Sequence, residues 1–148
     1  MSERRYFFTR EVDALVPWLA NLFGAVAVAR EEMRCIYKEL SEHGIDLAEL
    51  DEDTIDTAND ELVSELRRFA LLRDQVIDSV RQIEERGGIV KDLEDGLVDF
   101  PHMLDGAEVY LCWRYGEESI THYHEVESGY SGRKALPGRE DVSRRCLN

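Results

Sequence analysis

The chain has 148 residues, of which 43% are hydrophobic and 34% are charged, a composition typical of one globular domain with a single core. Its formal net charge at pH 7 is −14, and the sequence has no concentrated basic patch, which argues against a nucleic-acid partner. The longest apolar stretch, residues 12–29, is interrupted by Asp13, Pro17, Asn21 and Gly24, so no membrane span is predicted.

A long helix is predicted from Thr9, a suitable N-cap, to about His43, where Gly44 suits the left-handed residue that ends a helix. Apolar residues recur through this segment in alternating steps of three and four, the heptad pattern of a helix packed lengthwise on a partner. Pro17 predicts either a kink or a later start. The heptad positions are Val12, Leu15, Leu19, Leu22, Val26, Ala29, Met33, Ile36 and Leu40.

A second helix is predicted to begin near Asp53 or Thr54 and to end at Gly87 and Gly88, after an acidic turn at residues 45–52. Two long helices joined by a short connection make an antiparallel hairpin, here residues 9–87, with coiled-coil-like packing. A lone hairpin leaves apolar side chains in water, so we expect a homodimer formed through the helices. Seven-residue spacing in the second helix involves Ile55, Leu62, Phe69, Val76 and Ile83.

After Gly88 the hydrophobic period changes to two, which predicts a small antiparallel β module over residues 88–130. The last two of its strands should form a hairpin. Residues 131–148 read as a flexible tail. The sequence therefore predicts a single α+β domain, 1–148, with a helical hairpin followed by the β module. The expected strands are 89–91, 96–100, 108–115 and 119–126.

The C-terminal half also carries a specific pattern: GLVDFP at 96–101, EVYLCWRYGE at 108–117, HYHE at 122–125 and GYSGR at 129–133. Together with the opening YFFTRE at 6–11 and Pro17, this pattern resembles a family of small prokaryotic proteins known as a domain of unknown function. The resemblance spans nearly the whole chain. It implies that the strand region is a defined module, and it assigns no activity.

His122 and His124 are the most suggestive candidate ligands, because alternate residues of a strand share a face and two imidazoles could bind one divalent metal ion. Their neighbours depend on the turn before them. A three-residue turn places Cys112 opposite His122 and Tyr110 opposite His124, whereas a two-residue turn places Leu111 and Val109 there. The sequence leaves both registers open.

A polar pocket is the second candidate site, in which charged neighbours and burial shift the pKa of a general acid or base. The alternative is structural: the histidines and Arg114 hydrogen-bond to carboxylates such as Asp99 or Glu125. Cys112 is read either as an activated thiol or as a buried, inert one. The candidate binding residues are Asp99, Arg114, His122, His124, Glu125 and Arg133.

The leading functional interpretation is a cytoplasmic, oligomeric binding or interaction protein that uses the β module as its recognition surface. The alternative is a metal-dependent or acid–base enzyme with its site at the hairpin of His122 and His124. Cytoplasmic placement follows from a start that lacks a secretory signal and from three widely spaced cysteines without a disulfide pattern. The sequence identifies no ligand, reaction or partner.

Overall fold

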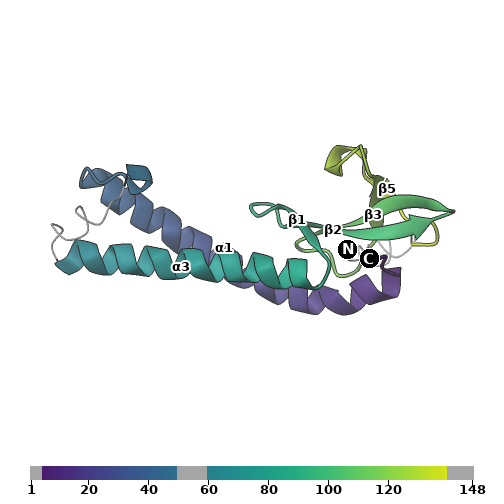
Figure 1. The fold of residues 1–148 in the computed structure, drawn as a ribbon, viewed down its shortest axis with the longest axis horizontal. Helices are drawn as coiled ribbons and strands as arrows, with labels where there is room; N and C mark the ends of the chain where they lie inside the picture. The colour runs from purple at the N-terminus through teal and green to yellow at the C-terminus, as the bar shows by residue number, and fades with distance from the viewer. Residues whose placement is uncertain (1–4, 50–59, 140–148) are drawn as a thin grey trace, which may run out of the picture. The chain divides into compact units, whose positions relative to one another are not determined.

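The computed structural model of the chain describes residues 5–49 and 60–139, drawn in colour in Figure 1. Its contacts divide the chain into two compact units. The sheet unit comprises Met1–Phe23 with Gln82–Asn148, and the hairpin unit comprises Gly24–Arg81. Two long helices, α1 (Thr9–Glu42) and α3 (Asp60–Glu85), pass through both units. The predicted α+β fold, a helical hairpin followed by an antiparallel sheet, is confirmed.

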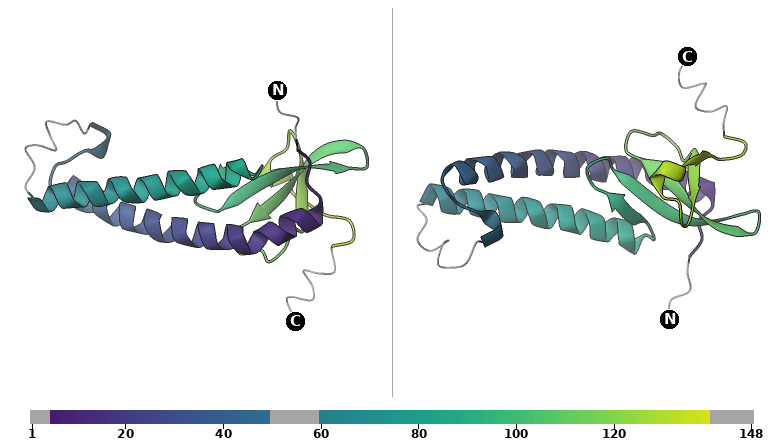
Figure 2. Two further views of the ribbon diagram at one scale, coloured as in Figure 1. Left: turned by 60° about the horizontal axis from the view of Figure 1, so that its bottom comes forward. Right: turned by 90° about the horizontal axis from the view of Figure 1, so that it is seen from above.

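The hairpin unit consists of parts of α1 and α3 that run antiparallel beside one another, with a short 3-10 helix, η1 (Leu47–Glu49), after α1 (Figures 1 and 2). An ion pair of 2.8 Å between Arg68 and Glu32 joins the two helices. The predicted start of the second helix near residue 53 lies outside the described residues. The buried apolar residues of this unit occupy the expected positions on both helices: Val26, Ala29, Ile36, Leu40, Leu66, Leu72 and Val76.

Capping interactions define the ends of the helices. At the start of α1, the Phe8 amide donates to Glu11 Oε1 at 2.9 Å and the Phe8 carbonyl accepts from Val12, so Phe8 is the N-cap rather than the predicted Thr9. The helix continues through Pro17, which is exposed. The predicted glycine stops are confirmed, because Gly44 and Gly87 have φ of 77° and 98°.

The sheet has five antiparallel strands in sequence order: β1 (Ile89–Asp92), β2 (Leu97–Leu104), β3 (Ala107–Arg114), β4 (His122–Glu125) and β5 (Lys134–Ala135). The predicted hairpin of the last two expected strands is confirmed as β3 and β4. A second 3-10 helix, η2 (Tyr130–Gly132), precedes β5. Because β5 pairs with β4, the sheet extends one strand beyond the prediction.

One face of the sheet forms the hydrophobic core with the first part of α1, the purple segment in Figure 2. Trp113 is fully buried, and its indole Nε1 donates to the Glu117 carbonyl at 3.0 Å. Ile83 near the end of α3 also belongs to this core. The fully covered residues on the strands are Val98, Phe100, Leu111 and Trp113.

The segment from η2 to residue 139 is part of the folded sheet unit, so the prediction of a flexible tail from residue 131 is wrong for residues 131–139. Leu136 is 3% exposed and belongs to the core. Arg139 donates to the Ile120 carbonyl at 2.9 Å and pairs with Asp13 at 2.7 Å. The polar composition of this segment gave no sign of its one buried apolar side chain or of its partly buried ion pair. Residues 140–148 lie outside the described part of the chain.

Helix α1 is long and apolar enough to cross a membrane by length and composition alone. A core helix passes the same test, and Val12, Val16, Leu19 and Phe23 of α1 lie in the core of the sheet unit. The expectation that residues 12–29 do not span a membrane stays a prediction.

Leu136→Ala should lower the free energy of unfolding by about 2–5 kcal/mol, because it removes a buried side chain from a packed core. Met103→Ala, at a site that is 44% exposed in the same unit, should change it by no more than about 0.5 kcal/mol. Urea unfolding of both variants measures the difference. Equal, small effects would show that the C-terminal segment does not pack on the core.

Candidate functional site

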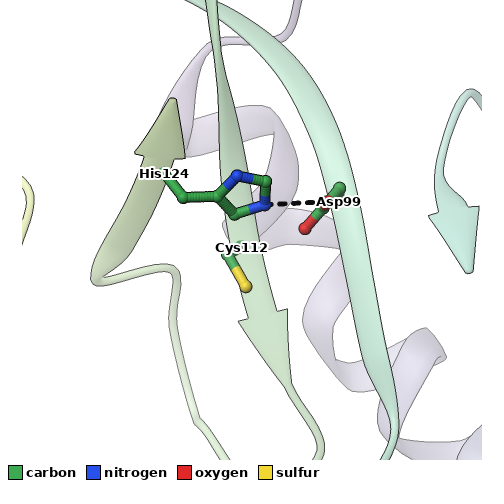
Figure 3. Close-up of side chains that lie close together, drawn as sticks. All are labelled: Asp99, Cys112 and His124. Carbon is green, nitrogen blue, oxygen red and sulfur yellow. Dashed lines mark hydrogen bonds and ion pairs between the residues drawn. The ribbon is translucent and has the colours of Figure 1, made fainter. Parts of the chain in front are cut away.

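The strand register brings three possible metal ligands together on the sheet face opposite the core. Asp99 on β2 pairs with Cys112 on β3, and Tyr110, two residues before Cys112, pairs with His124 on β4. Directly opposed residues share a face, as do alternate residues along a strand. Asp99, Cys112 and His124 therefore project from three adjacent strands toward one point (Figure 3).

All three side chains are buried, with exposed fractions of 2% for Asp99, 1% for Cys112 and 3% for His124. One ligand atom from each lies within 4.8 Å of the other two. Among the residues that the structure describes, these three form the group of His, Cys and carboxylate side chains close enough to share a metal ion. Buried polar groups need partners, and here the partners are one another.

His124 is held through both of its ring nitrogens. Nδ1 lies 2.8 Å from the carbonyl oxygen of Glu125, which can only accept, so Nδ1 carries a hydrogen. Nε2 lies 2.8 Å from Asp99 Oδ2 (Figure 3). One proton therefore lies between Asp99 and His124, on the carboxyl or on the ring. Burial raises the pKa of the Asp99 carboxyl, and the charge and hydrogen bond of His124 act against that rise.

Cys112 is a protonated thiol in this arrangement. Burial, together with the negative charge of Asp99, raises its pKa to about 12. A thiol needs a base to become a nucleophile, and both nitrogens of His124 are already engaged by other groups. The activated-thiol hypothesis therefore finds no support in this geometry, whereas a metal ion could displace the thiol proton.

A cavity of ≈160 Å³ adjoins the three side chains. Besides Asp99, Cys112 and His124, Lys91 on β1 and Tyr130 in η2 contribute to its wall. Arg114 donates to the Tyr130 hydroxyl at 3.1 Å and keeps the tyrosine in place over the sheet. The buried polar group is thus reachable from an enclosed space rather than sealed within packed side chains.

The other predicted histidine, His122, lies on the same strand face as His124 but outside the three-residue group. Its Nδ1 is 2.7 Å from Thr121 Oγ1. Burial and the positive charge of Arg133 lower its pKa, so the ring is favoured in its neutral form. The register with Cys112 opposite His122 is the one observed. It brings His124 close to Asp99 and Cys112, and it does not place His122 and His124 together as ligands of one metal ion.

The remaining predicted residues support the site without joining it. Arg133 donates to the Cys112 carbonyl at 2.9 Å and forms a close ion pair with Glu117. Arg114 is exposed and contacts Tyr130. Glu125 offers its main-chain carbonyl to His124, while its carboxylate pairs with Lys134 at 3.1 Å.

Cys112 was weighed as a thiol but was not among the predicted metal or binding residues, and Lys91 was not considered for the site. Cys112 could have been assigned to the site face from the sequence, because it lies between Leu111 and Trp113, which are both strongly apolar and suited to the core face. Lys91 carries no such signal, since a lysine on an edge strand is common at any exposed position.

Replacing Asp99 with Asn should change how stability depends on pH. The raised pKa means that, between the unfolded and folded pKa values of Asp99, the folded chain binds more protons than the unfolded chain. Raising the pH through that interval, upward from about 4, should therefore reduce the stability of the wild type relative to Asp99→Asn. The expected slope of the difference approaches about 1.4 kcal/mol for each pH unit of the interval.

Urea unfolding of both proteins at a series of pH values measures this difference, in which the titration of groups away from the Asp99 and His124 pair cancels. A wild type that gains stability relative to Asp99→Asn as the pH rises would instead indicate a depressed pKa.

Residues 5–136 of the chain match the model of a protein family described as uncharacterized conserved protein (DUF2203). The match covers both helices and all five strands, including Asp99, Cys112 and His124. Neither the curated proteins nor the solved structures contain a match to this chain. The expected resemblance is confirmed, and the chain belongs to the DUF2203 family of uncharacterized conserved proteins.

Proposed function

We propose that this chain is a metal-binding protein that holds a divalent metal ion between Asp99, Cys112 and His124. Zinc is the first candidate for this ion. The observation that carries the proposal is the burial of these three donors within 4.8 Å of one another beside a cavity. A carboxylate oxygen, a thiolate sulfur and an imidazole nitrogen are the ligand types that zinc uses in proteins. The proposal moves the expected metal ligands from His122 and His124 to this group.

The hydrogen bond from His124 Nδ1 to the Glu125 carbonyl supports metal binding, because it orients the ring and leaves Nε2 directed toward Asp99 and the other ligand. Metal-bound histidines in proteins are usually held in this way through their second nitrogen. An ion would replace the proton between Asp99 and His124 and the proton of the Cys112 thiol. Binding would then release protons and strengthen as the pH rises.

A second candidate function is proton transfer by the Asp99 and His124 pair, without a metal. The raised pKa of Asp99 and the adjoining cavity favour it, because a buried carboxyl that exchanges a proton with an imidazole can serve as a general acid or base. The two candidates differ in their response to zinc, which would block proton transfer by this pair.

We further propose that copies associate through the hairpin unit, with coiled-coil packing between helices, in the cytoplasm. Four large apolar side chains of this unit are 47–62% exposed, which is the surface a second hairpin would cover. The free thiols of Cys35 and Cys112 suit a reducing compartment. The exposed residues are Val28, Tyr37, Leu71 and Ile77.

Wild-type protein purified without a tag and stripped of metal should bind one zinc ion per chain, measured by calorimetry and by elemental analysis after dialysis. Cys112→Ser, close in size, should weaken zinc binding by more than about tenfold because it removes a thiolate ligand. Cys35→Ser, which changes an exposed cysteine in the hairpin unit, is the matched control and should bind like the wild type. Equal affinity in all three proteins would place zinc elsewhere.

Light scattering coupled to size-exclusion chromatography should show a dimer whose dissociation constant rises at least about tenfold, roughly 1.4 kcal/mol, in Leu71→Asp. The charge would lie in the apolar surface that the second copy covers. Met103→Asp introduces the same charge at an exposed position of the sheet unit and should leave the dimer intact. A strict monomer at high protein concentration would contradict association.

A further inference from the structure

The proposed metal group supplies three protein ligands, one fewer than zinc normally takes. Structural zinc sites are closed by four protein ligands, whereas sites that act on other molecules keep one position for water or substrate. Among the described residues, no fourth His, Cys or carboxylate joins the group. That leaves the remaining position open to a ligand from solution.

The cavity lies where that fourth ligand would have to approach. Asp99, Cys112 and His124 all contribute to its wall, so the space adjoins the three donors directly. Its volume of ≈160 Å³ is about five times the ~30 Å³ that one water molecule occupies in the liquid. This volume suits a ligand of a few non-hydrogen atoms.

Charge selects the kind of ligand. A divalent ion bound by one carboxylate, one thiolate and a neutral imidazole has no net charge, so the bound group neither attracts nor repels an anion strongly at a distance. Lys91 is the one cationic side chain among the described residues that line the cavity. Its ammonium lies close enough to stabilise the negative charge of Asp99. The cavity therefore combines a Lewis-acidic ion with an ammonium group.

Two tyrosines complete the wall with groups that suit a small polar ligand. Tyr110 lies opposite His124 in the register, and the centres of the two rings are 5.5 Å apart with their planes tilted by 48°. Tyr130 is 40% exposed and follows Gly129, whose φ of 62° and ψ of −166° belong to a conformation essentially restricted to glycine. This turn places Tyr130 at the cavity, where solvent still reaches its side chain.

We propose that the open position takes a small inorganic or carboxylate anion from solution, which coordinates the metal ion and pairs with Lys91. This inference rests on the metal site proposed above. It makes the centre a ligand-binding site rather than a structural one, and it assigns Lys91 to the ligand rather than to the metal.

Cobalt(II) in place of zinc tests the inference, because its absorption spectrum reports both the thiolate ligand and the coordination of the open position. Metal-stripped wild type loaded with cobalt should show a thiolate-to-cobalt band. Azide, as the probe anion, should then shift the visible bands with a saturable dependence on concentration. Lys91→Gln should raise the azide dissociation constant about three- to fivefold, as expected for the loss of one partly exposed charge pair.

Lys134→Gln is the matched control, because Lys134 is an exposed lysine that pairs with Glu125 and does not line the cavity. Its azide affinity should equal that of the wild type. A thiolate-to-cobalt band that azide leaves unchanged would overturn this inference while the metal site stands. Azide binding of equal strength in Lys91→Gln would also overturn it, because the anion would then lie away from Lys91. The absence of the band itself would instead refute the metal site.

Discussion

The antiparallel register of β2, β3 and β4 is the constraint on which the rest of this account depends. It places Asp99 opposite Cys112, and it places His124 on the next strand opposite Tyr110, two residues from Cys112. A shift of one residue between β3 and β4 would turn His124 to the core face. The polar cluster would be lost, and the imidazole would be buried among apolar side chains. The same register turns Leu111 and Trp113 toward the helix, so the hydrophobic core and the polar group stabilise one and the same strand alignment.

Both faces of the central strands are covered, each by different chemistry. The core face packs on α1, whereas the face with Asp99, Cys112 and His124 is covered by the chain that returns through η2 to β5. Arg133 donates a hydrogen bond from this returning segment to the Cys112 carbonyl, and its guanidinium carbon lies 5.3 Å from the centre of the Tyr130 ring. Burial of three polar side chains is destabilising unless they bond to one another, so the cover and the polar group require each other.

The helices could be predicted from the sequence because their signals are local. The heptad spacing and the glycines at 44 and 87 act within a few residues, and the structure confirms both. The predicted strands were also close to those observed. The tail was misread because a two-residue strand and the single buried Leu136 are too short to raise a periodic signal above a polar background.

The site was only half predictable, for a physical reason. Asp99 and His124 were candidates by residue type, but their association depends on the loop of residues 115–121, whose length allowed two registers. One local and one long-range hydrogen bond hold that loop: the Trp113 indole donates to the Glu117 carbonyl, and the Ile120 amide donates to Asp13 at 2.8 Å. The second of these bonds joins residues 107 positions apart, and a local sequence pattern does not report it.

The most direct test of this account is an anomalous diffraction map, recorded at the zinc absorption edge, from crystals grown with zinc. The account predicts a single strong peak per chain, about 2.0–2.3 Å from Asp99, Cys112 Sγ and His124 Nε2, with a non-protein ligand on the cavity side. A map without a peak there, in which His124 Nε2 still bonds to Asp99, would contradict it and leave the three residues as a buried structural cluster.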